Sequence, residues 1–497
     1  KMAEWLEKKG FGKRVVNYKL RDWGISRQRY WGTPIPIVYC DKCGIVPVAE
    51  KDLPVLLPDD VQFTGQGNPL ASHKPFVDTK CPKCGGKGRR ETDTMDTFVD
   101  SSWYFLRYCN PEAKGMFDPA AVKYWMPVDQ YIGGAEHAVM HLLYARFFVK
   151  VLRDLGLLSF DEPFTRLFNQ GIVYRDGHKM SKSFGNAVTQ EEIAGRYGID
   201  TARVFLLFVA SPDSQVEWND KGIQGAYRFL SRYQGLVLSN GKNMGTGPYK
   251  AVKVRDRILQ ARMSLAVQRM TLQIEDFQLN LAIGTGMEFL SFLQSYAAKE
   301  EVNEKLFGEA VRTLIKLMSP FAPHTSEELW EKAKMKGFVS VAPWPQAVKA
   351  DEKAVEMEAM IERLREDMAS VVKLSGMTPK KIRLVVSSKW KYVMMDRLCA
   401  QAEKTRNFGE ILKALMADPS LRPYGKDVSR MVPALLKNPE RMRACALSQE
   451  DEVCVLEEIS PELSEAFGCA VSIETAEKSD SKKASQAMPG KPGIEVA

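Results

Sequence analysis

The sequence predicts a multidomain protein of the α/β plus α class. Over residues 128–197 the pattern runs strand, helix, strand, loop and helix, which is typical of an α/β layer. After Asp220, four long stretches carry apolar residues at helical spacing with no strand signal between them, which predicts an all-α bundle. Basic and apolar residues alternate over 380–386, and this strand pattern opens a small α+β module.

The elements of the α/β layer are expected in a definite order. Residues 1–12 are charged and indicate a helix already under way at the start of the chain. Residues 128–134 predict a strand that ends in two glycines, and 136–155 predict one amphipathic helix. A second strand at 166–173, a polar loop at 174–186 and a helix near 189–197 complete the layer.

The second half of the chain is expected to be helical and then mixed. The predicted bundle spans 221–346, with helices at 222–238, 254–276, 279–297 and 303–318. A charged linker helix is expected at 350–374, followed by a basic domain at 376–475. Residues 476–497 are rich in Lys, Ser, Pro and Gly, and this composition predicts a disordered tail.

Charge points to a polyanionic partner. The 497 residues carry a net charge of +8, and residues 376–447 alone contribute +9, so the remainder is nearly neutral. A basic module on a neutral body indicates RNA or DNA binding, although a solvated basic face is the alternative. No apolar run is long enough for a bilayer, so no membrane partner is expected.

The ends and the cysteines suggest where the protein works. No signal peptide is recognisable, and the chain begins without Met, so a fragment or a processed product is expected. The nine cysteines show no disulfide framework, which indicates a reducing, cytoplasmic environment.

Four cysteines form two CxxC pairs, Cys40 with Cys43 and Cys81 with Cys84. Each pair places two soft thiolates one turn apart, and two pairs complete a tetrahedral site, so a structural Zn²⁺ is expected in an insert at 39–87. Four cysteine ligands leave no open position for catalysis. Fortuitous thiol turns are the alternative, because the spacing between the pairs exceeds the usual one.

A cationic loop precedes the helix near 189–197. Lys179 and Lys182 lie three residues apart among hydroxyls and next to Gly185, a composition suited to phosphate. An ordinary exposed basic loop is the alternative. The string 179–183, KMSKS, resembles the second signature of the class I aminoacyl-tRNA synthetases.

Further segments resemble the leucyl-tRNA synthetase family over almost the whole chain. They are 20–32 (LRDWGISRQRYWG), 91–98 (ETDTMDTF), 131–138 (YIGGAEHA), 141–144 (HLLY) and 320–324 (PFAPH). Segments 379–382, 389–392 and 422–426 resemble the C-terminal domain of archaeal and eukaryotic members, so the archaeal type is expected. The resemblance implies that 1–38 and 88–220 form the second half of a Rossmann-like catalytic domain, and that the bundle is an anticodon-binding domain.

The first signature of the class, HIGH, is absent, because none of the five histidines stands in an H-x-G-H setting. The half that carries it, and the editing insert, are expected upstream or on another chain. The isolated chain should therefore neither form leucyl-adenylate nor edit. An isoleucyl- or valyl-type enzyme, and a non-catalytic zinc-containing tRNA-binding subunit, remain alternatives.

The resemblance also implies residue roles. The family activates leucine with ATP and Mg²⁺ to leucyl-adenylate, and transfers it to the 3′-terminal adenosine of tRNA(Leu). Lys182 is expected to meet the developing pyrophosphate, with Lys179 in support. The residues expected beside ATP and the adenylate are Gly133, Gly134, Glu136, His137, Gln170, Ser181 and Ser183. The expected leucine pocket comprises Phe98, Ser101, Tyr104 and His141, with both histidines on one helix face.

The basic C-terminal domain is expected to grip tRNA through phosphates and shape. The residues expected at that contact are Lys389, Trp390, Lys391, Tyr392 and Lys426. The alternative for Trp390 and Tyr392 is that both are core aromatics of a strand.

Overall fold

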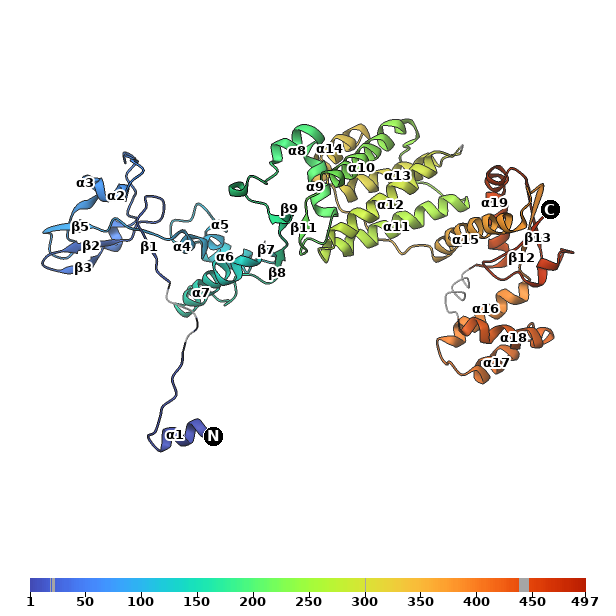
Figure 1. Cartoon of the computed structure of the whole chain (residues 1–497), viewed down its shortest axis with the longest axis horizontal. Coiled ribbons are helices and arrows are strands. Elements are labelled where there is room, and N and C mark those ends of the chain that lie inside the picture. The colour runs from blue at the N-terminus through green and yellow to red at the C-terminus, as the bar shows by residue number, and fades with distance from the viewer. Residues whose placement is uncertain (18, 20–22, 300, 438–446) are drawn as a thin grey trace. The chain divides into compact units, whose positions relative to one another are not determined.

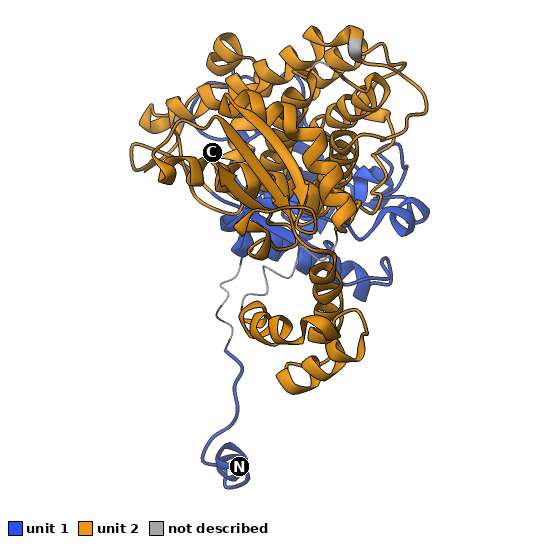
Figure 2. Ribbon diagram, turned by 90° about the vertical axis from the view of Figure 1, so that its right-hand side faces the viewer, with its two compact units in different colours: residues 1–171 blue, residues 172–497 orange. Residues whose placement is uncertain are grey.

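The computed structural model (Figure 1) describes residues 1–17, 19, 23–299, 301–437 and 447–497. The chain divides into two compact units, Lys1–Gly171 and Ile172–Ala497 (Figure 2). The first unit holds the CxxC pairs and the glycine-ended strand. The second unit holds the loop with the two lysines, the helical bundle and the basic module. Within the described ranges, no helix has the length and hydrophobicity to cross a membrane.

Short elements dominate the start of the first unit. Four antiparallel strands in the order β3-β2-β5-β4 carry the CxxC pairs, and β1 pairs with β6 beside them. The bounds are α1 Met2–Lys8, β1 Ser26–Arg27, β2 Ile37–Cys40, β3 Gly44–Pro47, α2 Pro69–Ser72, α3 Lys74–Val77, β4 Asp78–Lys80, β5 Lys87–Arg90 and β6 Thr94–Met95. The helix expected at the start of the chain is present as α1.

A parallel strand–helix–strand unit follows. Strands β7 (Tyr131–Gly134) and β8 (Leu167–Gln170) pair in parallel, and α7 (His141–Asp154) lies between them in the chain. The preceding helices are α4 Thr97–Ser101, α5 Tyr104–Tyr108 and α6 Pro119–Trp125. The hydrophobic core joins α5 and α6 to α7 through Phe105, Leu106, Val122, Ala145, Val149 and Leu152.

The strand predicted at 166–173 is wrong beyond Gln170, because β8 ends there and a new strand, β9 (Val173–Arg175), begins in the second unit. β9 pairs with β10 (His178–Lys179) and β11 (Val216–Glu217) instead of β7. Apolar spacing marks residues as strand-like but does not say which partner each segment takes. Helices α8 (Gln190–Tyr197) and α9 (Ile199–Phe208) complete this region.

Five helices form the bundle of the second unit. They are α10 Asp220–Ser239, α11 Val254–Glu275, α12 Leu279–Ala297, α13 Glu304–Met318 and α14 Pro323–Lys332. The first four agree with the predicted segments to within two residues at each end. Asparagine caps help to set the starts, since the side chain of Asn219 accepts from Lys221 N and that of Asn303 from Leu306 N. The core also includes Ile193 and Phe205, so α8 and α9 belong to it although the predicted domain began at 221.

A three-stranded sheet forms the base of the C-terminal module. Its order is β13-β12-β14, with β12 (Lys381–Val386) parallel to β13 (Ala470–Thr475) and antiparallel to β14 (Gly493–Val496). Helices α15 (Glu352–Ser375) and α19 (Gln449–Phe467) share its core. The predicted disordered tail is therefore wrong: Ile494 is buried, and Lys381 N donates to the carbonyl of Ala497. Composition alone does not reveal that a short apolar segment can pair with a free strand edge.

A helical lobe stands between β12 and α19 in the chain. It consists of α16 (Lys389–Ala402), α17 (Phe408–Ala417) and α18 (Gly425–Leu436), which share a core of their own. The strand alternative for Trp390 and Tyr392 is wrong, because both lie in α16. Cys399, also in α16, is disulfide-bonded, which the scattered cysteines did not predict.

Candidate functional site

The carboxyl ends of β7 and β8 bring predicted residues together. Gly133 is the register partner of Asn169, and Gly134 is the partner of Gln170. A Cβ added at Gly134 would collide with the carboxylate of Glu136, so the missing side chain lets this carboxylate fold back over the strand end. Ligands of open parallel sheets bind outside this end of the strands, so Gly133, Gly134, Glu136 and Gln170, all of them predicted, lie where a ligand is expected.

The two predicted histidines do not share one helix. His137 lies in the 3₁₀ turn η2 (Ala135–Val139), and His141 is the first residue of α7. Met140 breaks the helix between them with φ −124° and ψ −102°. The single predicted helix is wrong at this point. Apolar residues continue at helical spacing through Met140, so the spacing does not reveal that the helical backbone is interrupted there. The rings are nevertheless neighbours, with centroids 6.2 Å apart.

The side chains of Tyr104, Tyr131 and His141 form a chain of hydrogen bonds. The Tyr104 hydroxyl lies 2.9 Å from the Tyr131 hydroxyl, which lies 2.6 Å from Nε2 of His141. Burial lowers the pKa of His141, and the neighbouring His137 lowers it further. Burial and the bond to Tyr104 raise the pKa of Tyr131 above its ordinary value. Both groups are therefore held in their neutral forms.

Sequence reasoning did not select Tyr131 as a site residue. The signal was present, because Tyr131 opens the glycine-ended strand and side chains of a strand alternate between faces. Its ring stacks on Phe164 with centroids 3.8 Å apart. Tyr104 and His141, both predicted, are thus brought together through a residue that was not.

The other two predicted pocket residues lie on α4. Phe98 packs edge-on against Tyr144 of α7 with centroids 5.7 Å apart, and Tyr144 stacks on Trp23 at 3.9 Å. The Ser101 hydroxyl donates to the carbonyl of Thr97 within the helix. Phe98 therefore contributes an aromatic wall, while the hydroxyl of Ser101 is already engaged.

The lysine loop (residues 178–186) begins from a tight hairpin. Asp176 and Gly177 connect β9 to β10 with φ values of 54° and 74°, which is typical of the turn that matches strand twist. Lys179 ends β10 and is exposed. The hydroxyls of Ser181 and Ser183 are 3.0 Å apart. Lys182 begins the 3₁₀ turn η3 (Lys182–Phe184), and the placement of its side chain lies outside the described part of the structure.

Asn186 closes this loop and was not predicted. Its Oδ1 accepts from the backbone N–H of Ser181 at 2.9 Å, and its Nδ2 donates to the carbonyl of Lys179 at 3.3 Å. Met180, between those two residues, packs against the core of the bundle and donates its N–H to Val173. One side chain thus holds the backbone on both sides of an anchored methionine. An amide following glycine at a loop end was the available signal.

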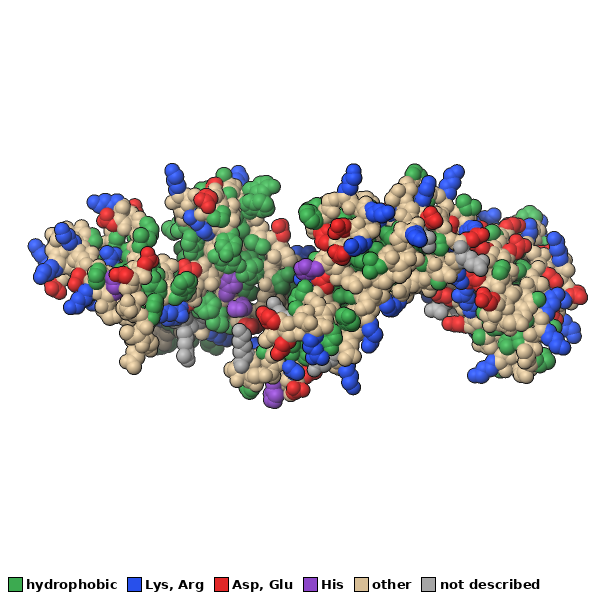
Figure 3. All heavy atoms as spheres, turned by 90° about the horizontal axis from the view of Figure 1, so that it is seen from above, with side chains coloured by type: hydrophobic (Ala, Val, Ile, Leu, Met, Phe, Trp, Pro, Cys, Tyr) green, Lys and Arg blue, Asp and Glu red, His purple; other side chains and the backbone are tan. Residues whose placement is uncertain are grey.

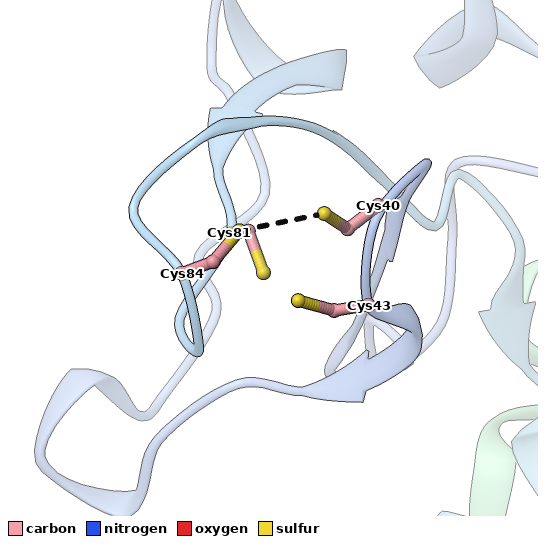
Figure 4. Close-up of side chains that lie close together, drawn as sticks. All are labelled: Cys40, Cys43, Cys81 and Cys84. Carbon is pink, nitrogen blue, oxygen red and sulfur yellow. Dashed lines mark hydrogen bonds between the residues drawn. The ribbon is translucent and has the colours of Figure 1, made fainter.

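The four paired cysteines converge on one point (Figure 4). Their sulfur atoms all lie within 4.8 Å of one another, and Sγ of Cys40 is 3.7 Å from Sγ of Cys84. Zinc–sulfur bonds of about 2.3 Å in a tetrahedron imply sulfur separations of about 3.8 Å, so the four donors fit Zn²⁺. Gly44 and Gly85 follow each pair with φ of 72° and 71°, as the turns require.

Backbone groups also prepare the cysteine site for a cation. The N–H groups of Cys84 and Lys83 lower the pKa of Cys81 to about 7. The neighbouring thiols, Cys84 first, raise the pKa of Cys43 to about 12. The arrangement thus favours one thiolate among thiols even without a bound ion.

Two of the predicted RNA-contacting residues of α16, Lys391 and Tyr392, make hydrogen bonds inside the C-terminal module. Lys391 is only 4% exposed, and its ammonium donates to the carbonyls of Ser485 and Ala487 at 2.9 and 2.6 Å. Tyr392 donates to the buried carboxylate of Glu452. The predictions for Lys391 and Tyr392 are therefore wrong, because a lysine flanked by aromatics suggested an RNA contact, whereas these side chains fix the C-terminal segment.

The remaining predicted RNA-contacting residues lie at the surface or near it. Lys389 pairs with Glu450 at 2.7 Å, and this carboxylate raises the pKa of Lys389. Trp390 stacks on Tyr424 with centroids 4.5 Å apart. Lys426 is exposed on α18. Lys389 and Lys426 retain the accessibility that an RNA contact needs, whereas Trp390 also packs against the core of the lobe.

Comparison with known proteins identifies two regions of the chain. Residues 2–219 match the family of tRNA synthetases class I (I, L, M and V), and residues 256–384 match the anticodon-binding domain of tRNA ligase. The leucine–tRNA ligase of Thermotoga maritima is 52% identical over 368 residues, which is 72% of this chain. The chain belongs to the class I tRNA synthetases. Its class I catalytic-type region is thus followed by a helical anticodon-binding domain.

Other relatives of this synthetase chain extend the match. The leucine–tRNA ligase of Geotalea uraniireducens is 45% identical over 440 residues, 87% of the chain. The LeuRS of Agrobacterium radiobacter K84, solved as a LeuRS-tRNA-LeuAMS complex, is 37% identical with a TM-score of 0.65 over 78% of the chain. These sources are bacterial, so they lend no support to the archaeal-type interpretation. The chain spans about half the length of these relatives, between 44% and 50% of it.

Proposed function

We propose that this chain supplies the KMSKS half of a leucine–tRNA ligase, which forms leucyl-adenylate from leucine and ATP and transfers leucine to tRNA(Leu). The observation that carries the proposal is the 52% identity to a leucine–tRNA ligase over 368 residues. The named structural relative binds both tRNA and LeuAMS, which supports the same substrates here. An isoleucyl- or valyl-type enzyme is disfavoured, because the named relatives at 45–52% identity are leucine–tRNA ligases.

The leucine pocket in this proposal is built around Tyr104 and His141, with Phe98 as an apolar wall and Ser101 at its edge. The rings of Tyr104 and His141 lie 6.2 Å apart, and both belong to buried or half-buried side chains. An apolar wall distinguishes side chains that differ by one methylene by only ~1–3 kcal/mol. Discrimination among leucine, isoleucine and valine therefore needs the polar groups and the remainder of the protein as well.

ATP contacts are proposed within each unit separately, at the ends of β7 and β8 in the first unit and in the lysine loop in the second. Gly133, Gly134, Glu136, His137 and Gln170 lie at the strand ends, and Lys179, Ser181, Lys182 and Ser183 lie in the loop. Mg²⁺ that accompanies ATP adds positive charge to the triphosphate. Lys182 would donate to the departing pyrophosphate, and one positioned donor of this kind contributes ~3–4 kcal/mol to the rate.

A further half of the catalytic domain is part of the proposal. Among the described residues, β7 and β8 pair only with each other, whereas parallel sheets are ordinarily covered on both faces. Phe147, Val151 and Leu155 form an exposed stripe on α7, and Figure 3 shows hydrophobic side chains gathered on the surface over the first unit. The HIGH-containing half, on the same or a separate chain, would cover this surface.

The tRNA contact is proposed for the helical lobe. Lys426 and Arg430 lie four residues apart on one face of α18, Lys437 caps the end of this helix, and all three are exposed. This basic stripe lies next in sequence to Tyr424, whose ring is stacked with Trp390. Exposed cations suit the phosphates of an RNA backbone.

The cysteine site is proposed to hold a structural Zn²⁺. Cys40, Cys43, Cys81 and Cys84 would bind it, and the ion would join the β2–β3 hairpin to the β4–β5 pair. The insert at 39–87 would then depend on the metal for its stability. We also propose a cytoplasmic location, since the named relatives are enzymes of translation.

The decisive experiment is amino-acid-dependent ATP–pyrophosphate exchange. The chain is assayed alone and after addition of the N-terminal half of a relative, in trans or fused. Leucine-dependent exchange is expected only in the combined preparation, and Lys182→Ala should lower that rate by about 10²–10³-fold while tRNA binding persists. Exchange driven by isoleucine or valine would identify the rival enzyme. Retained tRNA binding without exchange in every combined preparation would point to a non-catalytic subunit.

A further inference from the structure

A partly buried chain of polar side chains joins three elements of the first unit. It runs from the Tyr104 hydroxyl on α5, through the Tyr131 hydroxyl on β7, to Nε2 of His141 at the start of α7. His141 is 9% exposed, and its other nitrogen, Nδ1, is buried without a partner among the described residues. A buried nitrogen without a partner is uncommon, so this atom calls for an acceptor or a donor from outside the chain.

The short bond identifies the donor between Tyr131 and His141. Hydrogen bonds from nitrogen to oxygen centre on about 2.9–3.0 Å, whereas hydroxyl donors make shorter ones. The 2.6 Å separation therefore indicates that the Tyr131 hydroxyl donates to Nε2. The oxygen of Tyr131 is then free to accept from the Tyr104 hydroxyl at 2.9 Å, and both bonds of the chain point toward the histidine.

The surroundings keep His141 neutral. Burial disfavours a charged imidazole, and the nearby His137 adds a repulsive charge whenever it is protonated. His141 also opens the 14-residue helix α7, whose N-terminal dipole disfavours a cation. A neutral imidazole that accepts at Nε2 must carry its proton on Nδ1.

We propose that Tyr131 is a positioning residue that fixes His141 in the Nδ1-protonated tautomer. The free Nδ1–H is then a donor, so its partner must be an acceptor. The inference rests on the proposed leucine pocket for its ligand: His141 would face the carboxylate or adenylate carbonyl oxygen of the leucyl group, not its ammonium group. Tyr131 thereby decides which end of the amino acid this histidine recognises.

The test measures the tautomer directly by nitrogen NMR on the full chain labelled with ¹⁵N-histidine. The chain has five histidines, and His141→Gln assigns the signal of interest by its disappearance. We expect Nδ1 to be protonated and Nε2 unprotonated in the unmodified chain. Tyr131→Phe keeps the ring that stacks on Phe164 but removes the hydroxyl, and should shift His141 by at least tenfold toward the Nε2-protonated form that histidine ordinarily favours in water.

Tyr104→Phe is the matched control, because it removes the outer bond of the chain and leaves the donation from Tyr131 to His141 intact. It should leave the tautomer unchanged. An Nε2-protonated His141 in the unmodified chain would overturn the proposal without any variant. An unchanged tautomer in a folded Tyr131→Phe chain would overturn it equally.

A second arm separates this inference from the proposed function. In the enzyme completed with the N-terminal half, leucine should shift the Nδ1 signal of His141, and leucinol, which lacks the carboxylate, should not. A confirmed tautomer with no response to leucine would refute the leucine pocket and leave the positioning role of Tyr131 intact. An equal response to leucinol would refute the assignment of the leucine carboxylate to Nδ1.

Discussion

Asn186→Ala should loosen the lysine loop without unfolding the bundle. The substitution removes two hydrogen bonds, of 2.9 and 3.3 Å, that join the side chain to the backbone at Ser181 and Lys179. Each such bond contributes about 0.5–1.5 kcal/mol net, and the longer one belongs at the low end. The expected loss is therefore about 1–2 kcal/mol, which raises the open population of the loop about 5- to 30-fold. Met180 remains packed against the bundle, so the effect should stay local.

Limited trypsin digestion reports this population, because the loop carries its own cleavage sites after Lys179 and Lys182. When reclosing is faster than cleavage, the initial rate follows the open fraction, so it should rise about 5- to 30-fold. Ser183→Ala is the control, because it removes only the hydroxyl contact with Ser181 and should change the rate by less than about threefold. Equal cleavage rates of the Asn186→Ala and unmodified chains would refute the loop-closing role of Asn186. An equally large increase in the cleavage rate of Ser183→Ala would show that the effect is not specific to Asn186.

Three further outcomes are expected. Cys81→Ser should lower bound zinc from about one ion per chain to well under one while the bundle keeps its unfolding midpoint; elemental analysis and circular dichroism check this, and a full complement of zinc in the variant would contradict it. Burial raises the pKa of Glu452 to about 7, so the native state holds a proton that the unfolded state loses near 4.5, and the free energy of unfolding should fall by up to about 3 kcal/mol as the pH rises from 4.5 to 7. Urea unfolding across that range measures the fall, and Glu452→Gln should abolish it. Reversing Lys426 and Arg430 to Glu should weaken tRNA binding and flatten its dependence on salt by roughly two phosphate contacts, and an unchanged slope in filter binding would assign the basic stripe to solvent.

Helices of the bundle could be predicted from the sequence because burial imposes a helical period that survives in the residues themselves. Leu279–Ala297 forms α12 as expected, and α13 begins one residue after the predicted start, at the Asn303 cap. The incorrect predictions concern which strands pair with one another, not the hydrophobic periodicity of a segment. The sequence of β8 and β9 predicted one continuous strand, but β8 pairs with β7 whereas β9 pairs with β11. Strand β14 was not predicted, and it pairs with the edge of β12 that β13 leaves open. A sequence pattern describes a segment, whereas pairing depends on residues that lie from tens to more than a hundred positions away.

The candidate site divides in the same way. The four cysteines could be predicted because two CxxC pairs supply the four thiolate ligands that a structural zinc ion requires. Tyr131 and Asn186 were not predicted, although the sequence offered a signal for each, since their roles come from side-chain hydrogen bonds that close only in the folded chain. Lys391 shows the converse error, because a lysine among aromatics suggested RNA and instead donates to two carbonyls in the interior.

The helical lobe leaves the sheet and returns to it at one place. Nε2 of Gln449, at the start of α19, donates to the carbonyl of Ser387, which directly follows the last strand residue before the lobe. Lys389 and Glu450 pair across the same junction. Because Lys391 and Tyr392 at the start of α16 bind the C-terminal segment, this first turn belongs to the module itself. The part of the lobe beyond it forms an insertion with joined ends, whose length could change without altering the order of the strands.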